Sequence, residues 1–273
     1  MNQFINDSLF AAVESGDVAK VKELLSAEGK VIASSFYGHK SIICAAKQGN
    51  NEILKILLES NETADRKSFW SNNYHTASVA LRHATCNGNM EAVKLLLEYG
   101  AGADVNNLKE AVMSAAENGC FEILKMLLES NPRTKWKRFW KNISVVLRYA
   151  SRKGNAEMVK LLIEYGAISV HKDSTGAIDL TGALIEALFI GNPDLILLLL
   201  KAGANVNIHD DNGFTPLIYA VLFPNENMEL IIEAMLAAGA DVNAKDKNRC
   251  SALMYAEKAG YTKIVEMMRN VEK

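Results

Sequence analysis

Apolar residues recur along the chain in blocks that each predict a pair of helices. In every block an apolar residue precedes an alanine by three positions, which places both on one helix face. These pairs are Leu9/Ala12, Ile42/Ala45, Leu81/Ala84, Val112/Ala115, Leu147/Ala150, Leu184/Ala187, Leu217/Ala220 and Leu253/Ala256. A second apolar pair follows in the first seven blocks, at Leu24-Leu25, Leu57-Leu58, Leu96-Leu97, Leu127-Leu128, Leu162-Ile163, Leu199-Leu200 and Met235-Leu236. Such self-similarity predicts an array of helical repeats.

Glycine marks the turn between the paired helices. It follows the alanine by four positions at Gly16, Gly49, Gly88, Gly119, Gly154, Gly191 and Gly260. A sharp helix-to-helix turn favours a residue that tolerates positive φ. The seventh block instead contains an insertion around Phe223-Pro224-Asn225, which predicts an enlarged turn. In the eighth block Met268-Arg269 replaces the second apolar pair, so we expect a polar outer face that caps the array.

The loops between blocks carry a recognisable signature. Gly203-Ala204-Asn205-Val206-Asn207 is followed by Asp210, Gly213 and Thr215-Pro216-Leu217, with related loops at 104–106 and 241–243. Across residues 7 to 270 the chain resembles the ankyrin-repeat family, although Ile218 stands where that family usually has histidine. The resemblance implies an all-α solenoid with finger loops and a single domain, 1–273. Its approximate repeats are 7–29, 40–61, 77–104, 108–131, 143–168, 181–205, 215–241 and 250–270.

A unit of about 70 residues occurs twice, because residues 52–61 correspond to 122–131 and Phe69-Trp70 corresponds to Phe139-Trp140. In both copies the segment before the next first helix is longer than the one from Leu200 to Leu217, and these two segments hold all three tryptophans. For the two Phe-Trp pairs, packing over the next repeat and partner binding stay open. Trp136 has no counterpart in the first copy, which favours a partner contact.

The chain has a net charge of −2, but residues 131 to 153 contain no acidic residue. Their basic residues are Arg133, Lys135, Lys137, Arg138, Lys141, Arg148, Arg152 and Lys153. Such a run is either a solvated charged face or a binding surface.

In the ankyrin family the concave surface is lined by the finger loops and by first-helix residues just before the turn glycine. Here that alignment brings Arg152 and Lys153 next to Phe189 and Ile190 of the following repeat. An exposed Phe-Ile pair indicates an interaction site, unless a tight contact between repeats buries it. We therefore predict a non-catalytic recognition module or adaptor for a protein or peptide with acidic and apolar groups. The candidate partner-binding residues are Arg82, Arg133, Trp136, Arg138, Trp140, Arg148, Arg152, Lys153, Phe189, Ile190 and Phe223.

Two other functions are compatible with parts of the sequence. The basic, aromatic segment 133–141 could bind a polyanion, either nucleic acid or an anionic membrane surface. Because the chain as a whole is mildly acidic, nucleic acid is the less favoured partner. A cysteine-dependent enzyme using Cys86 or Cys120 is the weakest reading, since no orienting group is implied. No phosphate-loop or metal-ligand motif occurs, so we expect no cofactor and no metal.

The cell compartment is inferred from simple features. There is no 18-residue apolar run, the first residues do not read as a secretory signal, and the four cysteines show no C-x-x-C spacing. We expect a cytoplasmic monomer with reduced thiols. Free-standing divergent arrays also resemble effectors that intracellular bacteria deliver into host cells, and cytosolic adaptors of eukaryotes.

Overall fold

The computed structural model describes residues 2–33, 36–60, 70, 74–130, 143–170 and 180–271. These residues form two compact units, 1–140 and 141–273, and each is described separately. Within the described ranges all extended regular elements are α-helices, and the only bridge pairs Lys245 with Ser251. The all-α expectation is confirmed. None of the described helices combines the length and the apolarity needed to cross a membrane.

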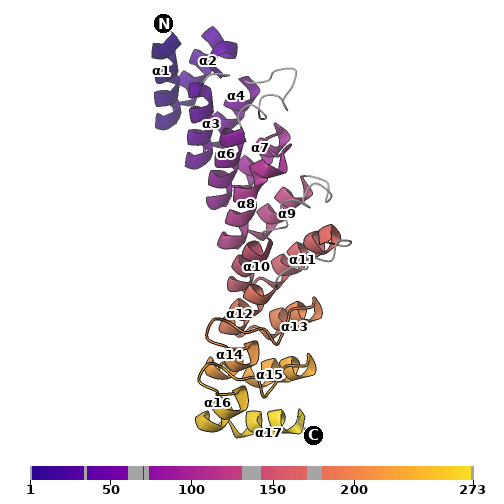
Figure 1. Ribbon diagram of the computed structural model, residues 1–273. Helices are drawn as coiled ribbons and strands as arrows, with labels where there is room; N and C mark the ends of the chain where they lie inside the picture. The colour runs from indigo at the N-terminus through magenta and orange to yellow at the C-terminus, as the bar shows by residue number, and fades with distance from the viewer. Residues whose placement is uncertain are drawn as a thin grey trace. The chain divides into compact units, whose positions relative to one another are not determined.

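In residues 1–140 the helices alternate between two rows (Figure 1). The first-helix row comprises α1 (Asn2–Ser15), α3 (Phe36–Gln48), α6 (Tyr74–Cys86) and α8 (Val105–Asn118). The second-helix row comprises α2 (Val18–Ala33), α4 (Asn51–Ser60), α7 (Met90–Glu98) and α9 (Phe121–Glu129). Each helix packs on its own pair mate and on the equivalent helices of the adjacent repeats, which is how a solenoid buries its core.

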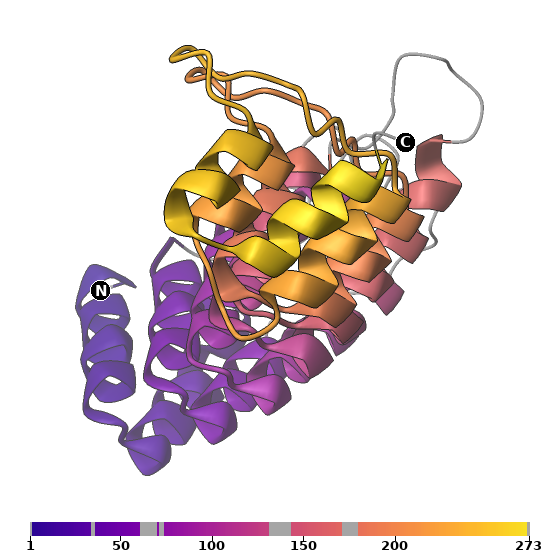
Figure 2. The same ribbon diagram turned by 90° about the horizontal axis from the view of Figure 1, so that it is seen from below.

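Residues 141–273 repeat this arrangement (Figure 2). Their first helices are α10 (Ile143–Arg152), α12 (Thr181–Ile190), α14 (Pro216–Leu222) and α16 (Ala252–Ala259). Their second helices are α11 (Ala156–Val170), α13 (Pro193–Lys201), α15 (Met228–Ala237) and α17 (Thr262–Val271). The loops 202–215 and 238–251 project from this unit as two neighbouring fingers.

The predicted turn glycines all adopt the left-handed backbone conformation. Their φ angles lie between 64° and 75°, a region that side chains bearing a Cβ rarely enter. The predicted enlargement of the seventh turn is also confirmed, since five residues, 223–227, separate α14 from α15.

The residue after the turn glycine is often an asparagine that caps the second helix. The side chains of Asn50, Asn89, Asn155 and Asn192 each accept a hydrogen bond from the backbone N–H three residues later, at 2.9 to 3.1 Å. A cap of this kind stabilises a helix by about 1 kcal/mol. The Asn192 amide also donates to the Gly154 carbonyl of the preceding repeat, at 3.3 Å. Asparagine at this position thus starts the second helix of its pair, and Asn192 also links adjacent repeats.

The apolar positions named by the sequence pattern form the core. The apolar residue and the alanine of every first helix from Leu9/Ala12 to Leu217/Ala220 are buried, whereas in α16 only Ala256 of that pair is fully buried. Trp70 is 2% exposed, and its indole N–H donates to the Tyr99 carbonyl at 2.7 Å. Of the two interpretations for Trp70, packing is therefore correct. In α17 Met268 is buried while Arg269 is exposed and pairs with Glu257, as the polar-face expectation requires.

The finger loops of residues 141–273 are held by repeated bonds. One Asp210 carboxylate oxygen accepts from the backbone N–H groups of Asn212 and Phe214, and the other accepts from the Tyr219 hydroxyl. At Gly213, where φ is 81°, an added Cβ would lie 3.0 Å from the Asp246 Cα atom of the neighbouring finger. The two fingers therefore pack backbone against backbone.

Candidate functional site

The ends of the first helices bring equivalent positions of neighbouring repeats together. Arg152 and Phe189 each lie two residues after the recurring alanine of their helix, while Glu186 and Tyr219 each lie one residue before it. Arg152 contacts Glu186, and one repeat further Phe189 contacts Tyr219. The same contact position is therefore an ion pair between α10 and α12 and an aromatic pair between α12 and α14.

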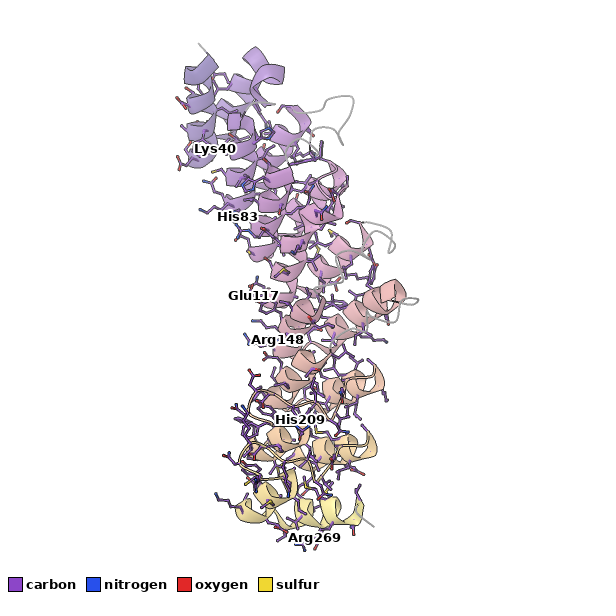
Figure 3. The ribbon with its side chains drawn as sticks, viewed as in Figure 1. Lys40, His83, Glu117, Arg148, His209 and Arg269 are labelled. Atoms are coloured by element: carbon purple, nitrogen blue, oxygen red, sulfur yellow. The ribbon has the colours of Figure 1, made fainter. Side chains whose placement is uncertain are left out.

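The ionic part consists of two arginines on one carboxylate. Arg148 donates to Glu186 at 3.2 Å, and Arg152 donates through two nitrogens at 3.0 and 3.2 Å. Burial alone would raise the pKa of Glu186, but the hydrogen bonds from Arg152 and Arg148 lower it below its usual range. The Glu186 side chain is only 14% exposed, whereas those of Arg148 and Arg152 are 53% and 57% exposed. Figure 3 shows Arg148 at the outer edge of the first-helix row.

The position of Arg148 depends on Gly182 at the start of α12. A Cβ at residue 182 would approach the Arg148 Cγ and Cδ atoms to 2.8 and 2.5 Å, so the arginine stem lies directly against the glycine. This close approach positions the guanidinium near Glu186.

The aromatic part is a cluster of three rings at the ends of α12 and α14. The Phe189 ring meets Phe223 edge to face with centroids 4.8 Å apart, and meets Tyr219 in the same way at 5.6 Å. Phe189, Ile190 and Phe223 nevertheless remain 45 to 49% exposed. The alternative that a contact between repeats buries Phe189 and Ile190 is therefore wrong. Rings that pack on one another and still face solvent form a pre-ordered apolar surface.

Six side chains make up this face, which we call the Arg-Phe strip: Arg148, Arg152, Lys153, Phe189, Ile190 and Phe223. It carries cations at α10 and apolar groups at α12 and α14, all within residues 141–273. The strip can offer charge-assisted hydrogen bonds and apolar contact area side by side.

The remaining predicted residues are located elsewhere. Arg82 lies in residues 1–140, where its Nε atom is 3.3 Å from a Glu110 carboxylate oxygen. In the same unit Lys40, His83 and Glu117, from α3, α6 and α8, lie along one edge of the first-helix row (Figure 3). Arg133, Trp136, Arg138 and Trp140 fall outside the described residues, as do Phe69 and Phe139.

Glu186 was missed by the sequence reasoning. The basic run between 131 and 153 contains no acidic residue, but Glu186 lies 34 positions after Arg152 and reaches it through the stacking of α12 on α10. A signal was available, because Glu186 precedes its alanine by one position, where Tyr219 and Tyr255 stand in later repeats.

The cysteine chemistry considered above has little support from its surroundings. Cys86 is exposed, and burial, followed by the nearby Cys86, raises the pKa of the Cys120 thiol. A raised pKa reduces the fraction of the nucleophilic thiolate at neutral pH. Among the described residues, no group of three or more His, Cys, Asp or Glu side chains is arranged to hold a metal ion.

Comparison with known proteins agrees with this architecture. The family model for ankyrin repeats in three copies matches residues 69–138 and 184–272, and the model for a single ankyrin repeat matches residues 145–174. The chain belongs to the ankyrin-repeat family. The crystal structure of the ankyrin repeat protein EF0377 superposes with a TM-score of 0.55 at 24% identity, covering 69% of this chain and 96% of that one.

Two curated relatives match most of the chain. The human transient receptor potential cation channel subfamily A member 1 is 25% identical over 269 residues, covering 84% of this chain and 24% of the channel. The putative ankyrin repeat protein FPV022 of fowlpox virus is 26% identical over 233 residues, covering 83% of this chain and 37% of the viral protein. The chain thus spans about a quarter and somewhat over a third of these two relatives.

Proposed function

We propose that this chain is a non-catalytic recognition module that binds a protein partner through the Arg-Phe strip. Ankyrin repeats generally mediate protein-protein interactions, and the family assignment supports that class of function. The observation that carries the proposal is the pairing of half-exposed Phe189, Ile190 and Phe223 with the exposed arginines of the adjacent repeat.

The strip favours a partner that presents acidic and apolar groups together. Glu186 engages one nitrogen of Arg148, and a guanidinium carries five N–H donors, so donors of Arg148 remain for a partner carboxylate. Glu186 also fixes the two guanidinium groups before binding, which reduces the rotamer entropy lost in the complex. Phenylalanine and isoleucine supply the apolar contact area.

Local charge favours an acidic protein over a polyanion. Arg148 and Arg152 share the Glu186 carboxylate, so the three cations of the strip and this one anion leave a formal excess of two positive charges. Nucleic-acid binding usually needs more phosphate contacts than that. The four cysteines are all free thiols, which supports a reducing compartment such as the cytoplasm.

Affinity capture from the cells that contain the protein tests the proposal. We expect wild type to retain a partner that the charge-reversed Arg148→Glu/Arg152→Glu protein loses. Lys109→Glu/Lys125→Glu provides the control, because it changes the charge equally at two exposed lysines on α8 and α9. A partner retained equally by all three proteins would contradict the role of the strip. Material that is released by moderate salt and contains nucleic acid would instead indicate polyanion binding.

A further inference from the structure

A second apolar and charged surface lies on the opposite helix row of residues 141–273. On α13 the buried pair Leu195-Ile196 is preceded by Asp194 and followed by Leu197. On the adjacent α15 the buried pair Ile231-Ile232 is preceded by Leu230 and followed by Glu233. All four flanking residues are exposed, and Leu230 and Leu197 reach 57% and 40%.

These four residues, Asp194, Leu197, Leu230 and Glu233, form what we call the Leu-acid patch. The helices α13 and α15 pack side by side, and each leucine on one helix occupies the position equivalent to an acid on the other. Within the described residues neither Asp194 nor Glu233 forms an ion pair. The patch therefore offers two carboxylates and two large apolar side chains.

The chemistry of the patch complements that of the Arg-Phe strip. The strip carries arginines beside phenylalanine and isoleucine, whereas the patch carries carboxylates beside leucines. We propose that the Arg-Phe strip of one copy of this chain binds the Leu-acid patch of a second copy. This inference rests on the strip being the binding surface of the proposed function.

The two surfaces cannot meet within one molecule. The strip lies on α10, α12 and α14, and the patch lies on α13 and α15 in the other row, with the packed core between the rows (Figure 2). A contact between different surfaces of two copies is heterologous, so a chain with one occupied strip still offers a free patch. From the sequence we expect a monomer, whereas this pairing would produce concentration-dependent self-association.

The association should be weak and sensitive to salt. Both surfaces consist of a few exposed side chains, which is typical of small, transient interfaces. Charge pairs at such surfaces are screened by added salt. We expect a dissociation constant on the order of 0.1 mM at low ionic strength.

Sedimentation velocity of the whole chain provides the test. We expect the weight-average sedimentation coefficient of wild type to rise as the concentration increases to about 0.5 mM. A strip-reversed protein, Arg148→Glu/Arg152→Glu, and a patch-reversed protein, Asp194→Lys/Glu233→Lys, should each remain monomeric alone. An equimolar mixture of the two should associate, because the basic strip of the patch-reversed protein can then bind the acidic patch of the strip-reversed protein. Lys109→Glu/Lys125→Glu should associate like wild type, because these exposed lysines lie on α8 and α9, which carry neither the strip nor the patch.

Circular dichroism and thermal unfolding establish that the reversed proteins are folded. If either is not, Arg148→Gln/Arg152→Gln and Asp194→Asn/Glu233→Gln replace them, and each should weaken association at least about tenfold. Wild type that stays monomeric at every concentration overturns the inference, as does a mixture no more associated than its components. If wild type stays monomeric but captures a partner whose binding depends on the strip, self-association is rejected. The proposed function then still stands.

Discussion

The hydroxyl of Tyr219 donates a hydrogen bond of 2.7 Å to the carboxylate of Asp210, nine residues earlier in the chain. Tyr255 and Asp246 repeat this relationship at the same separation in the next repeat, at 2.5 Å. In both cases the other carboxylate oxygen accepts two backbone N–H groups of the finger. In each finger, one aspartate thus closes the turn and links it to the following first helix. In the first finger this link lies beside the aromatic cluster that contains Tyr219.

Tyr219→Phe should destabilise residues 141–273 without changing their fold. The substitution removes a hydrogen bond to an ionised carboxylate, for which we expect a loss of about 1 to 2 kcal/mol in the free energy of unfolding. Urea denaturation measures this loss. Tyr149→Phe is the matched control, since Tyr149 occupies the equivalent position of α10. An equal effect of both substitutions would show that the bond to Asp210 contributes nothing specific.

Tyr219 and Tyr255 should titrate late in alkali. For Tyr219, burial followed by the hydrogen bond to Asp210 raises the pKa from 10.0 to about 12, and for Tyr255 the bond to Asp246 followed by burial does the same. Because the folded pKa is the higher one, this stabilisation is complete below pH 10 and is lost between pH 10 and about 12. NMR of the tyrosine ring resonances, assigned with Tyr219→Phe and Tyr255→Phe, measures these titrations. Resonances of both tyrosines that shift near pH 10 would contradict the raised pKa values.

The same finger should weaken in acid. Although burial opposes it, the hydrogen bonds from Tyr219 and from the backbone of Phe214 and Asn212 lower the pKa of Asp210 below 3.8. The folded pKa is the lower one, so this stabilisation is present above pH 3.8 and disappears as the pH falls through the lowered value. In Asp210→Asn the free energy of unfolding should lack the fall at acid pH that protonation of Asp210 causes in wild type. An unchanged pH profile would contradict the role of Asp210.

Gly182→Ala should separate binding from stability. The new methyl group would collide with the Arg148 stem and move its guanidinium away from Glu186, while alanine is favoured over glycine in a helix by about 1 kcal/mol. We therefore expect near wild-type thermal unfolding but reduced partner capture. Partner binding equal to that of wild type would show that the position of Arg148 is unimportant.

Trp70→Ala should be among the most destabilising substitutions in residues 1–140. The side chain is 2% exposed, and truncating a buried tryptophan costs about 3 to 5 kcal/mol. Trp70→Phe retains most of the apolar contact but removes the donor to the Tyr99 carbonyl, so a smaller loss of about 1 kcal/mol is expected. Denaturation midpoints of the two variants measure the difference. A Trp70→Ala protein as stable as wild type would contradict the packing role.

Much of the fold could be predicted from local sequence. The alanines, the turn glycines and the insertion at 223–227 each act within one repeat, through helix periodicity or backbone conformation. The exposed Phe189 and Ile190 were identified because their position relative to Gly191 repeats that of Arg152 and Lys153 relative to Gly154.

The contacts between repeats were harder to foresee. Glu186 binds Arg148 and Arg152 only because α12 stacks on α10 in a particular register, and that register is a property of packing rather than of any single segment. The aromatic cluster similarly needs Phe189 of one repeat and Phe223 of the next. Trp70 could be interpreted either way from the sequence, since a tryptophan in a long loop suits packing and binding equally.

Site-specific photocrosslinking tests the central claim most directly. A benzophenone amino acid at Ile190, which is 45% exposed within the strip, should form a covalent adduct with the captured partner. The same group at Lys125, an exposed residue of α9, should not, and Arg148→Glu/Arg152→Glu should abolish the Ile190 adduct. Equal crosslinking from both positions, or an Ile190 adduct that survives reversal of both arginines, would contradict recognition through the Arg-Phe strip.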